Sequence, residues 1–320
     1  MKLGRRPKSA VDRIVVIGVA IAGLFAADRL VAMAMGYAVS GSDAVLARLY
    51  TGRLNADGMV VGNSRAAKSF DVAAMSRRTG QDWINLGVNG MRPELTHAML
   101  RDYQDRCGLP STLVLEVSYL KSRWSDSAGA EFLLWARYGA NMESVLRHRL
   151  PTASRAADWF HLRRFGSQQY FRTLANRHGG DQNTAARRRI NDQTLAGIER
   201  LPIERFEIHR QIVGDLKNIL DDWESRGTTI RLVLAPYLPT FLTKIDNLQS
   251  WLEDVSVLLD RPIVDDSDAV IEPIHYADQV HLNRDGQAIF TDLYLGQISS
   301  SAESRHNRSG VRHLGVEVQR

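Results

Sequence analysis

Between residues 58 and 298 the chain alternates short apolar runs with longer amphipathic stretches, and this alternation restricts the possible folds more than any other feature. The apolar runs are expected to be strands, at 59–61, 83–86, 112–117, 229–235 and 262–265. The amphipathic stretches are expected to be helices, at 66–78, 93–106, 204–226, 242–259 and 285–298. Strands that are apolar along their whole length are buried on both faces, which is typical of a parallel sheet covered by helices. The sequence therefore predicts an α/β fold, a three-layer α/β/α domain with a parallel sheet over residues 40–297.

A long apolar segment at 14–39 precedes this domain and contains one charged pair, Asp28 and Arg29. A helix needs about twenty apolar residues to cross a bilayer, so we expect a single transmembrane anchor here. The basic residues of segment 1–13 would hold that end in the cytoplasm and place the domain in the periplasm or outside the cell. A signal peptide cleaved near the small-residue sequence AMA at 32–34 would also export the domain, and a buried core helix is the third alternative.

The segment 121–200 interrupts the alternation of strands and helices. It combines irregularly spaced aromatic residues with fourteen basic residues against seven acidic ones. We expect a helical insertion at the strand ends, where α/β domains form their binding clefts; solvated arginines over a small aromatic core are the plainer alternative. The segment 298–320 has no periodicity and is expected to be a disordered tail.

The composition limits the partners that the chain could bind. The net charge is +5, but the excess lies mostly at the two ends of the chain, so we expect no nucleic acid. The single cysteine, Cys107, excludes an intramolecular disulfide and a four-thiolate zinc site. His275, Asp278 and His281 lie close together in the sequence, but no further ligand motif accompanies them, and we expect no metal and no cofactor.

Three polar segments follow predicted strands, at the strand ends where α/β proteins place their sites. In the segment 62–65 (GNSR), Ser64 would present its backbone N–H at a helix N-terminus, which suits an anion; a simple helix N-cap is the plainer role. The segment 85–90 contains two glycines, which permit close approach of a ligand or merely a turn. In the third segment Asp278 precedes His281 by three residues, a spacing that allows a carboxylate to orient an imidazole for acyl transfer.

Together these segments resemble the sequence blocks of the SGNH (GDSL-like) hydrolase superfamily. GNS at 62–64 stands where that family has its GDS serine block, N-x-x-x-x-G at 85–90 is similar to its second block, and DQVH at 278–281 matches its terminal DxxH block. The resemblance covers residues 58 to about 295, with the insertion at 121–200 outside it.

The resemblance implies a role for each matching residue. Ser64 would be the nucleophile, His281 the general base and Asp278 the group that orients it, while the backbone N–H groups of Ser64 and Gly90 would form the oxyanion hole. The third block of the family, G-x-N-D, has no counterpart after the third predicted strand, because no asparagine is present there. Ser118 could supply a substitute hydroxyl, or the oxyanion hole has fewer donors.

The GNSR sequence, the N-terminal apolar helix and the large insertion are similar to a narrower branch of that family. Its members are membrane-anchored proteins that modify envelope polysaccharides, such as those that O-acetylate alginate or assist teichoic acid alanylation. We expect substrate contacts from four residues of this chain: Arg65, Asn89, Arg163 and Arg164.

The resemblance thus implies an exported, membrane-tethered serine O-acyltransferase or acetylesterase that acts on a cell-surface or secreted polysaccharide through an acyl-enzyme. Its expected partners are the glycan, the membrane and a membrane protein that donates the acyl group. Transfer is favoured over hydrolysis, because a large insertion could hold a polymer and exclude water. The alternative is a non-catalytic envelope protein that binds glycan or scaffolds a polysaccharide-modifying complex.

Overall fold

The computed structural model describes residues 10–175 and 185–312. Its centre is one sheet of five parallel strands in the order β2-β1-β3-β4-β5. The strands are β1 Gly58–Gly62, β2 Trp83–Gly87, β3 Thr112–Glu116, β4 Thr229–Leu234 and β5 Ile263–Asp265. Each expected strand is confirmed to within two residues, and so is the parallel α/β architecture.

Fifteen α-helices and three short 3-10 helices surround the sheet in the described part of the chain. The α-helices are α1 Ala10–Ser40, α2 Val45–Tyr50, α3 Ser64–Ser69, α4 Val72–Thr79, α5 Pro93–Cys107, α6 Asp126–Ala130, α7 Leu133–Ala136, α8 Ala140–Arg149, α9 Pro151–Trp159, α10 Gln168–Ala175, α11 Asp192–Ile198, α12 Arg210–Ser225, α13 Pro239–Leu242, α14 Leu248–Leu259 and α15 Arg284–Arg312. The 3-10 helices are η1 Val117–Lys121, η2 His161–Phe165 and η3 Pro273–His275.

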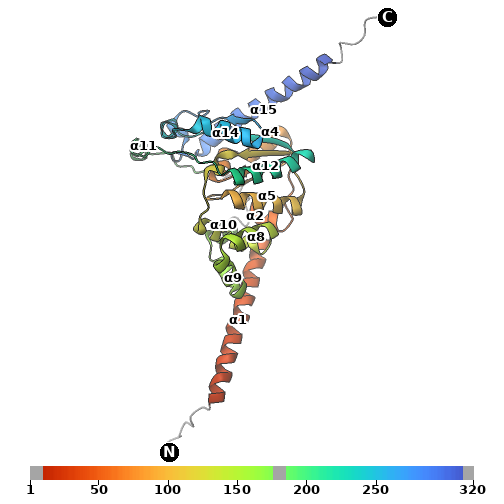
Figure 1. Cartoon of the computed structure of the whole chain (residues 1–320), viewed down its shortest axis with the longest axis vertical. Coiled ribbons are helices and arrows are strands. Elements are labelled where there is room, and N and C mark those ends of the chain that lie inside the picture. The colour runs from red at the N-terminus through yellow and green to blue at the C-terminus, as the bar shows by residue number, and fades with distance from the viewer. Residues whose placement is uncertain (1–9, 176–184, 313–320) are drawn as a thin grey trace, which may run out of the picture.

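Helices cover both faces of the sheet. On one face α12 packs between α5 and α14, and on the other α15 packs against α3 and α4. Figure 1 shows α5 and α12 on one side of the strands and α4 and α15 on the other. This distribution follows from the strand order, because the connection from β1 to β2 runs toward one edge of the sheet and the later connections run toward the other. Right-handed crossovers in opposite directions place their helices on opposite faces. All five residues of β1 are buried between the two helical layers.

The expected helix at 66–78 is wrong in one respect, because it is divided into α3 and α4. Phe70 has an extended backbone, and the carboxylate of Asp71 accepts a hydrogen bond from the N–H of Ala74 at 3.0 Å, which starts α4 anew. Asp71 also donates its own N–H to the hydroxyl of Thr291 on α15 at 2.9 Å. The break therefore fixes α15 to this face of the domain.

Two other expected helices begin later than predicted, because their first residues pair with each other instead. The N–H of Glu204 donates to the carbonyl of Lys244 at 2.6 Å, and the side chain of Asn247 bonds both backbone groups of Phe206 at 2.8 and 2.9 Å. These bonds between the segments 204–206 and 244–247 replace helical ones. The helices α12 and α14 start only at Arg210 and Leu248.

The helix α1 is continuous over 31 residues and is the one described helix long and apolar enough to cross a membrane. Its length and mean hydropathy of 2.2 fit either a membrane span or a signal sequence. Residues 10–24 are exposed on all sides, whereas from Asp28 onward one side is buried against the domain at Ala32, Gly36 and Val39. The part that is free to lie in a bilayer is therefore shorter than the expected segment 14–39.

The insertion at 121–200 is helical in its described part, but it does not sit mainly at the strand ends. The helix α8 packs against α5, while η2 and α10 pack against α1, and Figure 1 shows α8, α9 and α10 beside the upper half of α1. Among its described residues, Lys121, α10 and the segment 185–190 approach the strand ends. The expected tail also needs correction, because α15 continues past residue 298 to Arg312. No proline interrupts this stretch, and residues 313–320 of the expected tail lie outside the described residues.

Candidate active site

The turn that follows β1 places Ser64 at the first position of α3. Asn63 caps this helix, since its side-chain oxygen accepts a hydrogen bond from the N–H of Arg65 at 2.9 Å. Gly62 has φ +152°, and a Cβ at this position would lie 2.8 Å from the Cβ of Ala66. A side chain is therefore not accommodated there. Asn63, not Ser64, is therefore the N-cap of α3. The hydroxyl of Ser64 is not used for capping and can make other contacts.

The structure brings Ser64, His281 and Asp278 together from opposite ends of the chain. The Nε2 atom of His281 lies 2.7 Å from the Oγ atom of Ser64. The Nδ1 atom of His281 lies 2.9 Å from each carboxylate oxygen of Asp278. All three residues are partly exposed, so a ligand can reach them.

The charge of Asp278 determines which nitrogen of His281 carries the proton. Burial raises the pKa of Asp278, but the hydrogen bonds from His281 and from the N–H of Val280 outweigh this, so its pKa lies below the usual range. An ionised carboxylate only accepts hydrogen bonds, so Nδ1 of His281 must donate to it. Nε2 then presents its lone pair to the hydroxyl of Ser64, which is the arrangement that a general base requires.

The two backbone N–H groups expected to form the oxyanion hole have no hydrogen-bond acceptor in the described part of the structure. Within the described residues, neither the N–H of Ser64 nor that of Gly90 donates a hydrogen bond. Gly90 is exposed and has φ +73° in a turn closed by the N–H of Met91 on the carbonyl of Val88 at 3.1 Å. The side chain of Asn85 holds this region against α3, because its Nδ2 donates to the carbonyl of Ala66 at 2.9 Å.

Ser118 does not fit its expected role as an oxyanion donor. Its side chain is fully buried, and its hydroxyl donates to the Oε2 atom of Glu116 at 2.7 Å. Glu116 is itself fully buried and pairs with Arg65, whose Nε lies 3.3 Å from Oε1. The hydroxyl of Ser118 is therefore committed to a buried ion pair, and the position that has an asparagine in the SGNH block carries no free donor here.

Arg65 does not fit its expected role as a substrate contact either. Its side chain is only 4% exposed and lies over the ring of Tyr237, 3.3 Å from the ring centroid. Its guanidinium donates to the carbonyl of Val280 at 3.1 Å and to the carbonyl of Ala235. Arg65 thus connects α3, the ends of β3 and β4, and the loop that carries His281. It is a positioning residue.

The other expected substrate contacts divide into two groups. Asn89 is exposed and lines a small pocket of about 70 Å³ beside Gly87, together with Arg172 of α10. Arg163 and Arg164 belong to η2, which packs against α1 and α9, and the guanidinium of Arg164 pairs with Asp158 at 2.7 Å. The structure thus places these two arginines beside α1 and α9, and no described contact joins them to Ser64.

Three other cationic side chains, Lys68, Arg172 and Arg188, lie close enough to interact with one another or with Asp278, and sequence reasoning missed them. Lys68 lies one helical turn after Ser64, and burial lowers its pKa while the charge of Asp278 raises it. Arg188 lies 4.0 Å from Asp278, and Arg172 and Arg188 both act on the charge of Lys68. Only Lys68 had a sequence signal, since the spacing of four residues places it on the same helix face as Ser64.

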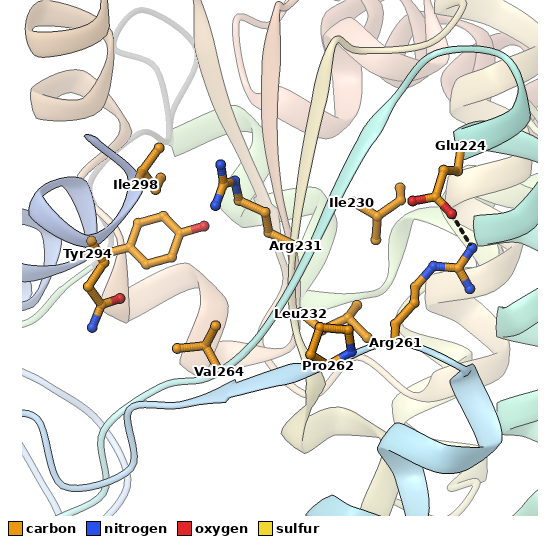
Figure 2. A pocket seen from close by; sticks show the side chains of 10 residues that line it. Glu224, Ile230, Arg231, Leu232, Arg261, Pro262, Val264, Tyr294 and Ile298 are labelled. Carbon is orange, nitrogen blue, oxygen red and sulfur yellow. Dashed lines mark hydrogen bonds and ion pairs between the residues drawn. The ribbon is translucent and has the colours of Figure 1, made fainter. Parts of the chain in front are cut away.

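A second, larger pocket of about 550 Å³ lies away from this site, between β4, β5 and α15. Figure 2 shows Arg231 and Tyr294 facing each other across it, with Arg261 paired to Glu224 at its other end. None of the three residues at the Ser64 site lines it. His275, considered above as part of a metal set, lies 3.4 Å from Glu272, and no group of three potential metal ligands occurs among the described residues.

Comparison of the sequence with protein-family models and with curated proteins gave no match.

Proposed function

We propose that this protein is an SGNH-type serine enzyme of acyl transfer, an O-acyltransferase or acetylesterase that acts on a polysaccharide outside the cytoplasm. One observation carries the proposal, namely the hydrogen-bonded chain from Ser64 through His281 to Asp278 with distances of 2.7 and 2.9 Å. This arrangement of hydroxyl, imidazole and carboxylate activates serine in enzymes of unrelated folds. The continuous helix α1 supports a membrane-tethered protein whose domain is exported.

The proposed reaction has two halves that share these residues. The Oγ atom of Ser64 attacks the ester carbonyl while its proton moves to Nε2 of His281, and Asp278 stabilises the imidazolium that forms. The alcohol leaves with that proton, and the acyl group remains bonded to Ser64. Water or a sugar hydroxyl then gives its proton to His281 and takes the acyl group, which restores the free serine.

The oxyanion hole proposed here has two backbone donors, Ser64 and Gly90, and no side-chain donor from the end of β3. Removal of one donor slows related reactions by about 100- to 1,000-fold. We therefore expect slow hydrolysis of small esters such as p-nitrophenyl acetate. An activated acyl group delivered by a membrane partner would tolerate this deficit, which favours transfer to a glycan over hydrolysis.

The cations around the site support a substrate with negative charge. Lys68 of α3, Arg172 of α10 and Arg188 interact electrostatically, and Arg188 also lies 4.0 Å from Asp278. Asp278 lies beside Arg188, and its carboxylate is engaged with His281. An acidic polysaccharide would complement this charge.

The second candidate is a non-catalytic protein that keeps the fold to bind a glycan or to scaffold a complex. The commitment of the Ser118 hydroxyl to Glu116 favours it, since a working SGNH site usually has a third donor there. The contact of the Ser64 hydroxyl with Nε2 of His281 opposes it.

A fluorophosphonate probe separates the two candidates, because it labels an activated serine without knowledge of the substrate. We expect labelling of the wild-type protein, loss of labelling in Ser64→Ala and His281→Ala, and full labelling in Ser250→Ala, which changes an exposed serine of α14. A folded wild-type protein that takes up no probe would support the scaffold. Equal labelling of Ser64→Ala would exclude Ser64 as the nucleophile.

The substrate is tested by incorporation of acetyl groups into acidic oligosaccharides, measured by mass spectrometry beside the release of p-nitrophenol. We expect Arg172→Gln to reduce transfer to the oligosaccharide more than hydrolysis of the small ester. Arg163→Gln is the matched control and should change neither, because Arg163 lies on η2 beside α1. Rapid deacetylation of glycans with no transfer would identify an esterase.

A further inference from the structure

The helix α1 consists of two parts with different surroundings. Its first part, up to residue 27, makes no extensive contact with the domain and exposes apolar side chains all round. Its second part, from Asp28 to Ser40, packs one side against the insertion and against α2. Figure 1 shows this first part projecting from the body and α9 lying beside the point where the two parts meet.

The charged pair Asp28 and Arg29 lies at this boundary of α1 and makes hydrogen bonds to the backbone of the insertion. The carboxylate of Asp28 accepts hydrogen bonds from the N–H groups of His161 at 2.8 Å and Leu162 at 3.1 Å, which begin η2. The guanidinium of Arg29 lies 3.4 Å from the carbonyl of Trp159. The end of α9 and the start of η2 are therefore held at a fixed level along α1.

Large apolar side chains are exposed at this same level. The exposed fractions of Trp159, Phe160 and Leu162 are 65%, 52% and 37%, and we call these three residues the apolar cluster. The rings of Trp159 and Phe160 lie 6.4 and 5.6 Å from that of Phe25 on α1, measured between centroids. The cluster is thus continuous with the exposed apolar surface of α1.

The length of α1 indicates what covers the apolar cluster. The uninterrupted apolar run of residues 14–27 spans only about 21 Å, whereas the hydrocarbon core of a bilayer is about 30 Å thick. A span that is too short draws its flanking residues toward the bilayer. Phe25 is near the end of this run, so the adjoining apolar cluster is the first part of the body that the bilayer meets.

We propose that Trp159, Phe160 and Leu162 enter the boundary between headgroups and acyl chains of the same bilayer that α1 crosses. Tryptophan is favoured at this depth because its ring is apolar and its N–H is polar. The exposed Arg163, which follows the cluster, is placed to meet lipid phosphates. The body is thus seated on the membrane at two points, α1 and the apolar cluster. This proposal does not depend on the chemistry of Ser64.

Tryptophan fluorescence tests this proposal on the full chain reconstituted in phosphatidylcholine bilayers with brominated acyl chains. The chain has six tryptophans, and none lies in α1, so quenching by the acyl chains reports on the body alone. We expect a loss of about one-sixth of the emission relative to unbrominated bilayers, because one of the six tryptophans reaches the lipid. Trp159→Phe should abolish this loss.

Two further variants complete the test. Trp124→Phe is the matched control and should quench as the wild type does, because Trp124 donates its indole N–H to Asp126 on α6, a helix that packs against α8. Phe160→Ser combined with Leu162→Ser should reduce the quenching of Trp159. All variants should remain in the membrane after carbonate washing, because α1 is unchanged.

Equal emission in brominated and plain bilayers, with the protein still in the membrane, would overturn the proposal. It would mean that the apolar cluster faces water or is covered by another polypeptide. Quenching that persists in Trp159→Phe would overturn it as well.

Discussion

Glu116 is the one negatively charged group among the described contacts of the buried Arg65 side chain. The substitution Glu116→Gln removes this charge. The two side chains are 0% and 4% exposed, and their closest atoms lie 3.3 Å apart. Removal of one partner from a buried ion pair destabilises a protein by about 3 to 5 kcal/mol, because the other charge stays buried without compensation. We expect the lower value, about 3 kcal/mol, for Glu116→Gln, because the amide oxygen can still accept a hydrogen bond.

Arg65→Met should lower the free energy of unfolding by more, about 5 kcal/mol, since it leaves Glu116 charged. It also removes the bonds of the guanidinium to the carbonyls of Val280 and Ala235. Because Val280 directly precedes His281, this variant should slow probe labelling of Ser64 in the fraction that remains folded. Glu116→Gln, which keeps the bond to Val280, should slow it less.

Thermal unfolding of the full chain in detergent, followed by circular dichroism, measures these effects. At about 2 °C per kcal/mol for a domain of this size, Glu116→Gln should lower the melting temperature by about 6 °C and Arg65→Met by about 10 °C. Glu207→Gln is the matched control, because Glu207 pairs with Arg123 on the surface and its loss should produce no measurable shift. The double variant Arg65→Met with Glu116→Leu should be more stable than either single variant. A melting temperature of Glu116→Gln equal to that of the wild type would refute this reasoning.

Three further predictions follow from buried groups. Burial lowers the pKa of His97 despite its bond to Asp215, so below pH about 6.5 the imidazole is protonated more readily in the unfolded chain than in the folded one. The melting temperature should therefore fall by a few degrees from pH about 7 to pH about 5. In His97→Gln this fall should be smaller. Gly62→Ala places a Cβ against Ala66 and shifts Ser64, so probe labelling should slow by about 10- to 100-fold, and an unchanged rate would contradict the assigned turn. Gly139→Ala makes a Cβ collide with the carboxylate of Asp102, so unfolding measurements should show a loss of about 1 to 3 kcal/mol, while labelling of folded protein stays normal.

The strands were predictable from the sequence because burial on both faces leaves an uninterrupted apolar run. The starts of two helices, at Arg210 and Leu248, could not be predicted. They are delayed by hydrogen bonds between the segments 204–206 and 244–247, and these bonds join residues about 40 positions apart. A local pattern contains no information about such a partner. The break between α3 and α4 at Phe70 could not be predicted from the local pattern either. Asp71 is a residue type that often caps helices, but only the structure shows that it caps α4.

The candidate site shows the same division. The contact between Ser64 and His281 could be anticipated, because each stands in a short segment whose residue types and order suit one chemistry. The role of Arg65 could not, since an arginine in the first turn of a helix is usually solvated. It is buried here only because Glu116 and the carbonyls of Ala235 and Val280 converge on it from three distant segments.

The unbroken course of α1 has a consequence for the range of molecules that the site can meet. The stretch from Asp28 to Ser40 is about 20 Å long and is packed along the body, so no flexible linker lets the domain rotate away from its anchor. Directly after it, the hydroxyl of Ser42 donates to the carbonyl of Thr173, which lines the small pocket shared by Asn89. If α1 spans the bilayer as we propose, the Ser64 site is therefore held at a constant distance from the membrane surface. Under the proposed function, the protein would then act on polymer chains close to that surface and would not reach chains that have diffused into the bulk.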